Sequence, residues 1–175
     1  QRMAASVVGR DDERARVILE ELQSDTTQAL EDLRDLARGV YPPLLADQGL
    51  AAALEAQGRK SAVPVDVTAD GIGRFPQEIE AAVYFSCLEA LQNVAKYAAA
   101  SRAVIRLANV RGELTFEVED DGVGFDASST GYGTGLQGMA DRLDALGGRI
   151  DVRSVRGSGT TITGVVPVAA TSATS

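Results

Sequence analysis

Three short segments, in a fixed order within about fifty residues, constrain the chain most. Residues 89–97 predict a helix with a polar stripe, residues 120–124 an acidic turn after a strand, and residues 133–138 a glycine-rich loop that opens a helix. Together they offer an amide, carboxylates and free backbone N–H groups. The chain has no histidine, so any chemistry that needs an imidazole must use another molecule.

The apolar periodicity around these segments predicts helices set among antiparallel strands. In one strand, Leu114, Phe116 and Val118 alternate toward the interior. Such a chain indicates an α+β fold in which helices and a sheet form a two-layer sandwich. We expect helices over 49–58, 77–99 and 136–146, strands over 63–67, 103–110, 114–119, 149–155 and 161–168, and a mobile loop over 126–134. Pro64 suits a strand at the edge of the sheet.

The first forty residues predict one long helix, over 12 to about 40. Its apolar residues repeat at alternating spacings of three and four, which is a heptad seam. Pro42 and Pro43 end the helix, and residues 41–45 form a stiff connector. The helix either packs on its own domain or belongs to a helical hairpin that dimerises into a bundle, and we favour the dimer. The seam consists of Leu19, Leu22, Thr26, Ala29, Leu33, Leu36 and Val40.

The bulk composition excludes several functional classes. A net charge of -8 argues against a nucleic-acid-binding surface, because phosphate contacts need a basic patch. No run of about 18 apolar residues is present, so no membrane span is predicted, and we expect a cytoplasmic location. The first residue is Gln, so we expect a fragment of a longer protein, with membrane contact only through missing upstream segments. The single Cys87 is expected to be a small buried residue on a helix.

The helical polar stripe has the chemistry of a magnesium site. Glu89, Asn93 and Tyr97 are spaced by four residues, so they are expected on one helix face, with Lys96 beside Asn93. A magnesium ion held by phosphates takes only one or two protein oxygens and keeps its waters. An Asn with a Glu one turn away fits that role, and Lys96 can neutralise phosphate charge. The alternative is a solvated polar stripe.

The acidic turn and the glycine loop suggest the rest of a nucleotide site. A carboxylate in residues 120–124 can accept a hydrogen bond from the exocyclic amine of a nucleotide base, while the glycines beside it let the base approach. The alternatives for this segment are a plain acidic turn and a calcium-binding loop. The glycines at 131–138 allow backbone N–H groups at the N-terminus of a helix to point at phosphate groups. The Walker Gly-Lys-Ser/Thr is missing, and no βαβ unit supports a dinucleotide fingerprint.

The order and spacing of these motifs resemble the Bergerat-fold ATP-binding family, which includes sensor histidine kinases and type II topoisomerase ATPase domains. The resemblance covers residues 77–168, with Gly157-Ser-Gly159-Thr160 as a last motif. Within the family, residues 35–45 and 135–142 resemble histidine kinases of the nitrate-sensor and desaturase-sensor type. We therefore expect residues 1–41 to be partial dimerisation and phosphotransfer helices, 42–168 the ATP-binding domain, and 169–175 a disordered tail.

The resemblance implies ATP and Mg²⁺ as cofactors and gives each motif a role. It makes Asn93 a ligand of Mg²⁺, with Glu89 supporting the metal or its water, and brings Lys96 to phosphate. Asp120 would accept from the adenine amine, and Thr160 would help to hold the base, through water. The remaining expected cofactor contacts are Gly122 and Gly124 at the base and Gly133, Gly135, Leu136 and Gly138 at the phosphates.

Two departures from the family pattern matter. Tyr97 stands where the family usually has His, and the phosphoacceptor histidine belongs on a first dimerisation helix of which only residues 1–8 remain. The resemblance thus implies a fragment that binds ATP but cannot phosphorylate itself. In the parent protein, the γ-phosphate would pass to a histidine and then to an aspartate on a response regulator.

Three other functions remain open at this point. An anti-sigma-factor serine kinase has the same fold and needs no histidine, although the long helix and residues 41–45 argue against it. A dimeric interaction module that has lost catalysis is the second, although Asn93, Asp120 and the glycines are intact. A gyrase-like or chaperone-like ATPase is the third, but 175 residues leave no room for a further working domain.

Overall fold

A computed structural model describes residues 42–69, 71–126 and 133–168. The chain divides between residues 41 and 42 into two units, and all described residues belong to the second. Several predictions fall outside the described residues: the long helix over 12–40, its dimerisation seam, the short helix over 1–8, most of the loop over 126–134, and the tail over 169–175.

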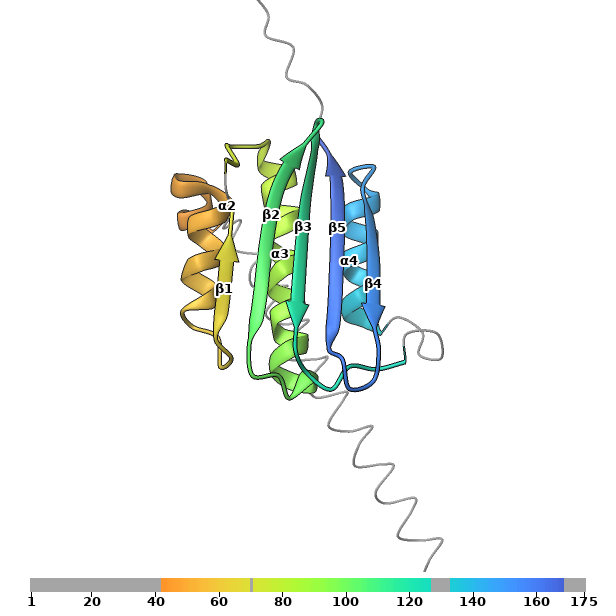
Figure 1. Ribbon diagram of the computed structural model, residues 1–175. Helices are drawn as coiled ribbons and strands as arrows, with labels where there is room; N and C mark the ends of the chain where they lie inside the picture. Colours follow the sequence, from red (N-terminus) through yellow and green to blue (C-terminus); the bar gives the residue numbers. More distant parts are fainter. Residues whose placement is uncertain (1–41, 70, 127–132, 169–175) are drawn as a thin grey trace, which may run out of the picture. The chain divides into compact units, whose positions relative to one another are not determined.

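Five strands form one sheet in the order β1-β2-β3-β5-β4 (Figure 1). Their bounds are β1 Val65–Thr68, β2 Ala103–Val110, β3 Glu113–Asp120, β4 Arg149–Ser154 and β5 Thr160–Pro167. The predicted strands are confirmed to within two residues at each end. One pair differs from the expected antiparallel pattern, because β1 runs parallel to β2. A long crossover through a helix joins them, as parallel neighbours require.

The edge position of β1 confirms the interpretation of Pro64. The strand begins at Val65, directly after the proline, and β2 is its only neighbour among the strands that the structure describes. The carbonyl of Pro64 still accepts a hydrogen bond from the N–H of Ala103 at 2.9 Å. Pro64 therefore contributes an acceptor to the ladder, and it stands directly before the first residue of the strand, where a proline is tolerated.

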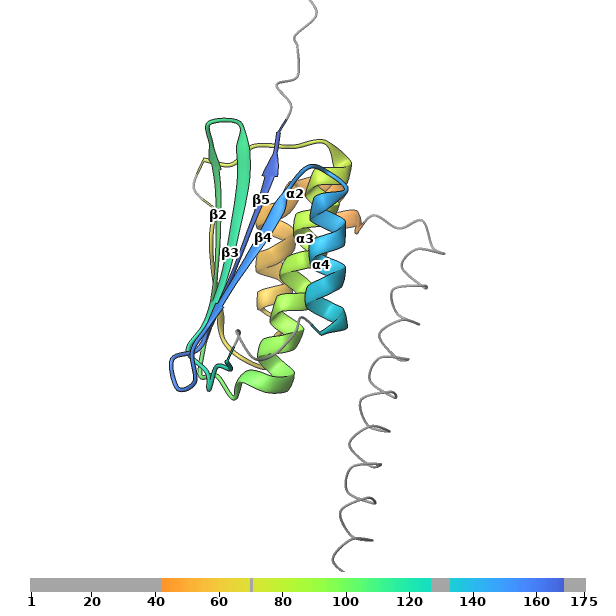
Figure 2. The same cartoon turned by 90° about the vertical axis from the view of Figure 1, so that its right-hand side faces the viewer.

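The helices cover one face of the sheet, so the predicted two-layer α+β sandwich is confirmed (Figure 2). Leu114, Phe116 and Val118 point to that face and are at most 2% exposed. The ring of Phe116 lies over Gly164 of the neighbouring β5, where any side chain would overlap the ring. Aliphatic residues of the helices complete the core. The helices are α2 Pro43–Gly58, α3 Gln77–Asn93, the π-helical turn η1 Val94–Ala98, and α4 Thr134–Asp144.

Two helix predictions need correction. Helix α2 begins at Pro43, well before the predicted start at residue 49. The prediction missed the first half because Gly49 interrupts the helix with a φ of 81°, so the apolar pattern of the sequence shows only the second half. The predicted connector is therefore helical from residue 43 onward. The helix predicted over 77–99 is α-helical only to Asn93, after which the chain forms a π-helical turn and leaves it at Ala99 with a φ of 47°.

Two smaller expectations in the helices are resolved. Helix α4 runs over 134–144 rather than 136–146, and Gly147 and Gly148 end it as expected, with the N–H of Gly148 bound to the carbonyl of Leu143 at 2.8 Å. Cys87 of α3 is fully buried, and this burial raises the pKa of its thiol. The thiol is therefore a core group, as predicted.

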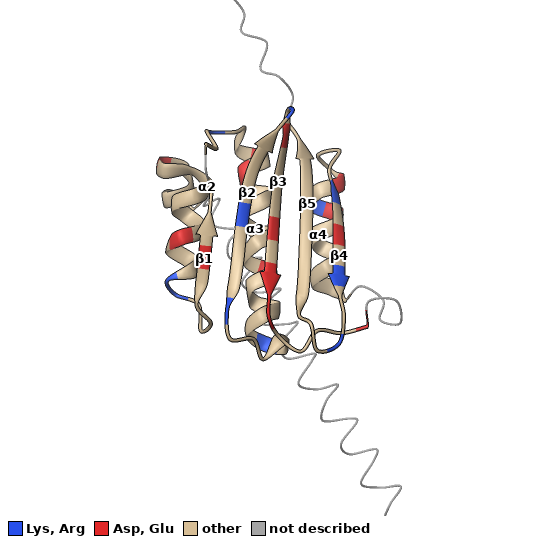
Figure 3. Cartoon of the chain, in the orientation of Figure 1, with Lys and Arg blue, Asp and Glu red and all other residues tan. Residues whose placement is uncertain are grey.

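The opposite face of the sheet is exposed and carries charges of both signs (Figure 3). Arg106 of β2 reaches Glu117 and Glu119 of β3, each at 2.6 Å. Hydrogen bonds to these two glutamates, that to Glu119 first, raise the pKa of the Arg106 guanidinium. The face is largely polar with local ion pairs, and most of the apolar core lies on the helix side.

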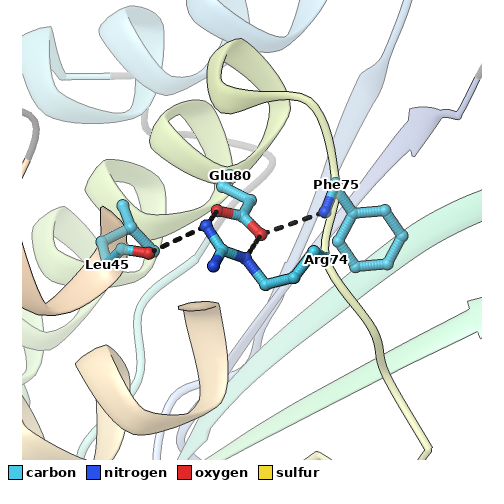
Figure 4. Close-up of polar contacts among 4 residues, drawn as sticks. All are labelled: Leu45, Arg74, Phe75 and Glu80. Atoms are coloured by element: carbon cyan, nitrogen blue, oxygen red, sulfur yellow. Dashed lines mark hydrogen bonds and ion pairs between the residues drawn. The ribbon is translucent and has the colours of Figure 1, made fainter. Parts of the chain in front are cut away.

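A buried carboxylate fastens the start of α3 to α2 (Figure 4). Glu80 is fully buried and accepts hydrogen bonds from Arg74 Nε at 2.9 Å, from Arg74 Nη2 at 3.1 Å and from the N–H of Phe75 at 3.0 Å. Arg74 Nη2 also donates to the carbonyl of Leu45 at 3.3 Å. A Cβ at Gly49 would stand 3.0 Å from Arg74 Cδ. The absence of a side chain at Gly49 therefore leaves room for the arginine that joins the two helices.

Replacing Arg74 by Met should destabilise the domain, because the buried Glu80 carboxylate would lose its charged partner. We expect the free energy of unfolding, measured by urea denaturation, to fall by about 2 kcal/mol, since Arg74 itself is half exposed. The matched control is Arg149→Met, which removes an exposed pair with Glu113 and should change stability by less than about 0.5 kcal/mol. Equal losses in both variants would contradict this role for Arg74.

Candidate functional site

The three segments singled out in the sequence meet at one edge of the sheet, where β3 and β4 end and β5 begins. The end of α3 with its π-helical turn and the start of α4 lie at the same edge, the lower one in Figures 1 and 2. Groups from these six elements are thus brought together although they are far apart in the sequence.

Glu89 and Asn93 lie on the last two turns of α3, and both are half-buried. The carboxylate of Glu89 lies directly over Gly135, in the first turn of α4: a Cβ at Gly135 would overlap Glu89 Oε1 and stand 3.0 Å from its Cδ. Gly135 therefore keeps the first turn of α4 close to the polar stripe of α3. The first and third segments are in direct contact.

Lys96 and Tyr97 lie on the π-helical turn rather than on a continued α-helix. Both are exposed, and Tyr97 retains 67% of its accessible surface. The prediction that an unbroken α-helix carries Tyr97 on the face of Glu89 and Asn93 is therefore wrong, because the wider turn changes the register after Asn93. Single π-helical turns of this kind are frequent at functional sites.

Asp120 is the last residue of β3 and is only 8% exposed. Its Oδ1 accepts a hydrogen bond from the N–H of Gly122 at 2.9 Å, and the N–H of Thr160 also donates to the carboxylate. Burial raises the pKa of this carboxyl, and the two backbone N–H groups oppose that rise only in part. The result is a partly dehydrated carboxylate on the helix side of the sheet.

The neighbouring Asp121 has a different role, which the sequence did not separate from that of Asp120. It is exposed and accepts hydrogen bonds from the N–H groups of Ser101 at 2.8 Å and Arg102 at 3.0 Å, and from the hydroxyl of Ser101. These bonds, that of the Ser101 hydroxyl first, lower the pKa of Asp121 to about 2. Asp121 fastens the turn to the start of β2, and the serine two residues before β2 was the available signal.

The glycines of the acidic turn allow backbone segments to touch. Any side chain at Gly122 would overlap the carbonyl of Ala98, and any at Gly124 would overlap that of Val155. The N–H of Val123 donates to Ala98 at 2.7 Å, and its carbonyl accepts from the N–H of Gly157 at 2.6 Å. The π-helical turn, the acidic turn and the β4–β5 turn are therefore packed backbone against backbone.

The glycines before and within α4 have more space. Gly133 caps the helix with extended backbone, and apart from adjoining residues and the helix's own nearby backbone, no described atom lies within 4 Å of an added Cβ at Gly133 or Gly138. Leu136 is half-buried in the first turn. The first N–H groups of a helix have no partner within it and carry partial positive charge, which suits an anion. The expected Gly131 lies outside the described residues.

One residue of the site was missed by the sequence analysis. Ser154, at the end of β4, accepts a hydrogen bond from the N–H of Phe125 at 2.8 Å and donates to the carbonyl of Gly159 at 3.1 Å. Its hydroxyl also lies 2.9 Å from that of Thr160. A serine at the end of a predicted strand carries no motif by itself, so only the pairing of β4 with β5 identifies it.

The described residues contain no group of three or more His, Cys, Asp or Glu side chains able to hold a metal ion alone. An amide and a carboxylate one turn apart, Asn93 and Glu89, suit an ion that takes most of its ligands from phosphate and water, as Mg²⁺ does. No helix in the described part of the chain has the length and apolar character needed to cross a membrane.

Comparison with known proteins agrees with this geometry. Residues 78–170 match the family described as "Histidine kinase-, DNA gyrase B-, and HSP90-like ATPase". The sensor histidine kinase MctS of Rhizobium johnstonii is 31% identical over 151 residues, which are 81% of this chain and 32% of that protein. The signal transduction histidine-protein kinase/phosphatase DegS of Brevibacillus brevis is 35% identical over 96 residues, 54% of this chain and 25% of that protein.

A solved structure shows the same fold. The histidine kinase domain of the blue-light activated histidine kinase from Erythrobacter litoralis EL346 is similar with a TM-score of 0.53 and 25% identity, over 67% of this chain and 57% of that one. The chain spans about a third or less of the length of the two curated relatives. With its matching fold and its sequence match over more than half of its length, the chain belongs to the histidine kinase-, DNA gyrase B- and HSP90-like ATPase family.

Proposed function

We propose that the domain over 42–168 binds ATP with Mg²⁺ at this sheet edge, as the catalytic part of a sensor histidine kinase. The observation that carries the proposal is the meeting of the half-buried Glu89 and Asn93, the first turn of α4 and the buried Asp120 at one edge of the sheet. Both curated relatives carry histidine kinase in their names, which supports this activity over others of the same family.

The carboxylate of Asp120 is proposed to accept a hydrogen bond from the exocyclic amine of adenine. Its low exposure makes a hydrogen bond to a ligand stronger than it would be in water, because water competes less. Gly122 and Gly124 keep side chains away from the turn beside it, and Thr160 lies next to it as its partner in the β3–β5 ladder. The base would thus lie against the acidic turn and the start of β5.

The phosphates are proposed to lie between α3 and the first turn of α4. Asn93 and Glu89 would hold Mg²⁺ or its water, and Lys96 would contact phosphate. The N–H groups at the start of α4 would face the phosphate oxygens, around Gly133, Gly135, Leu136 and Gly138. Mg²⁺, when bound, would neutralise the charge that develops during phosphoryl transfer. The chain's own residues would bind and orient the nucleotide.

The acceptor of the phosphoryl group must come from outside these 175 residues, because they contain no histidine. We propose that a histidine on a dimerisation helix receives it and passes it to an aspartate of a response regulator. Residues 1–41 would contribute part of that helical domain, 12–40 would form the homodimer, and the tail over 169–175 would be disordered. The site would act in the cytoplasm, with membrane contact only through other segments.

A protein in which the acceptor helix is restored should form labelled phosphohistidine when incubated with labelled ATP. If no phosphohistidine forms under any condition, the histidine kinase activity is rejected.

A serine kinase on the same fold is the second candidate, because it needs no histidine; the long helix predicted over 12–40 and residues 41–45 argue against it. A serine acceptor would sit on a partner protein and would need no imidazole. Phosphoserine on a partner incubated with this chain and ATP, without phosphohistidine in the parent protein, would select this alternative.

Replacing Asp120 by Asn should weaken ATP binding, because the carboxylate would lose its charge-assisted hydrogen bond to the base. We expect the dissociation constant, measured by calorimetry with Mg²⁺, to rise by about 10- to 100-fold, the value of one hydrogen bond to a charged group. The control is Asp151→Asn, on the exposed face of β4, which should leave the constant unchanged. Equal effects of the two substitutions would refute the assignment.

The same Asp120→Asn protein should fold at least as stably as the wild type at pH 7. Burial raises the pKa of Asp120 above its ordinary 3.8, so the folded state binds this proton more tightly than the unfolded state. Stability from this group therefore falls as pH rises through the window above 3.8, and an ionised Asp120 costs stability at neutral pH. A lower urea midpoint for the variant would show that lost folding, rather than a lost contact, weakens binding.

Replacing Asn93 by Ala should remove most of the effect of Mg²⁺ on binding. In the wild type, EDTA should weaken ATP binding by about tenfold or more, because the triphosphate charge is then unneutralised. In the Asn93→Ala variant, the dissociation constants of ATP with and without Mg²⁺ should be nearly equal. Asn109→Ala, on the exposed end of β2, serves as the control and should retain the full Mg²⁺ dependence. A full dependence in Asn93→Ala would exclude Asn93 as a ligand.

A further inference from the structure

Asp120, Thr160 and Ser154 form one row across three neighbouring strands. The register pairs Asp120 of β3 with Thr160 of β5, and Thr160 with Ser154 of β4. Asp120 and Thr160 alternate in phase with the buried residues of their strands, so they share the helix side of the sheet with the proposed base site. Ser154 thus lies on the strand next to Thr160, which is proposed to hold the base.

The hydroxyl of Ser154 makes three hydrogen bonds, which use all of its capacity. The carbonyl of Gly159 can only accept, so Ser154 must give it its single proton. The N–H of Phe125 can only donate, so it takes one lone pair of the serine oxygen. One lone pair remains for Thr160 Oγ1, at 2.9 Å. The one arrangement that satisfies all three contacts makes Thr160 the donor to Ser154.

Thr160 then has no proton left for a ligand. Its hydroxyl oxygen keeps lone pairs, so it can only accept from a base or from a water that bridges to the base. The ionised Asp120 beside it also only accepts. The edge that faces the purine therefore carries two acceptors, and both suit a 6-amino group, which donates. A 6-oxo group is itself an acceptor and would be left unpaired against them, which costs binding.

We propose that Ser154 sets the choice between 6-amino and 6-oxo purine nucleotides, by fixing the direction of the Thr160 proton. This inference rests on the proposed function, since it takes the base to lie beside Asp120 and Thr160. Ser154 is a positioning residue: it acts through Thr160 and through the turns that Phe125 and Gly159 belong to. Without its hydroxyl, the Thr160 hydroxyl can rotate and donate to a 6-oxo group.

The test compares ATP with inosine triphosphate, which carries a 6-oxo group and protonated N1, in calorimetric titrations of the full chain with Mg²⁺. In the wild type, ATP should bind at least about 30-fold more tightly than inosine triphosphate, and Ser154→Ala should reduce that ratio by about tenfold, the value of one hydrogen bond. Ser154→Thr keeps a hydroxyl and should restore the wild-type ratio. A merely structural serine would weaken both nucleotides equally in Ser154→Ala, and an unchanged ratio would overturn the proposal.

A second variant decides the matter if Ser154→Ala does not fold. Thr160→Val removes the Thr160 hydroxyl while keeping the shape of the side chain. It should therefore reduce the preference for ATP over inosine triphosphate at least as much as Ser154→Ala does. A wild-type ratio in Thr160→Val would overturn the proposal. If the folded wild type binds neither nucleotide, the proposed function fails and this inference with it. If ATP binds but the ratio never changes, only the role of Ser154 is wrong.

Discussion

The site depends on direct contact between three backbone segments at one edge of the sheet. The π-helical turn, the acidic turn and the β4–β5 turn touch with no side chain between them, because glycine stands at Gly122, Gly124 and Gly159. Two of these glycines also have positive φ, 56° at Gly124 and 77° at Gly159, which other residues adopt only at a cost. This packing sets the position of the buried Asp120 carboxylate and of Thr160 next to it. A side chain at any of the three would separate these segments.

Helix α3 connects this edge with the opposite end of the domain. Near its start it carries the buried Glu80, which Arg74 ties to the carbonyl of Leu45 in α2 (Figure 4). At its other end it carries Glu89 and Asn93, beside the first turn of α4. Thirteen residues of helix are about 20 Å long, so one rigid element joins the two places. The chain enters the described domain immediately before α2, so the anchor fixes its first turn to the helix that carries two proposed site residues.

Much of this arrangement could be predicted from the sequence, and the misses have physical causes. Strands such as β3 were found because one face is buried and the other is not, which gives Leu114, Phe116 and Val118 a period of two. The first half of α2 was missed because Gly49, with a φ of 81°, interrupts the helix and its apolar pattern. The π-helical turn leaves no mark in the apolar pattern. Ser154 was missed because its importance arises only when β4 pairs with β5. Sequence motifs identify groups that meet a ligand, whereas groups that position them emerge from the fold.

The most direct test of the site is to map nucleotide binding onto the amides of the chain by two-dimensional NMR. A non-hydrolysable ATP analogue with Mg²⁺ should shift the amides at 89–98, 120–124, 133–138 and 157–160, all at one edge of the sheet. The exposed face around Arg106 and Glu117 should stay unchanged. Shifts centred on that charged face, or no shifts at saturating nucleotide in a folded sample, would contradict a nucleotide site at this edge.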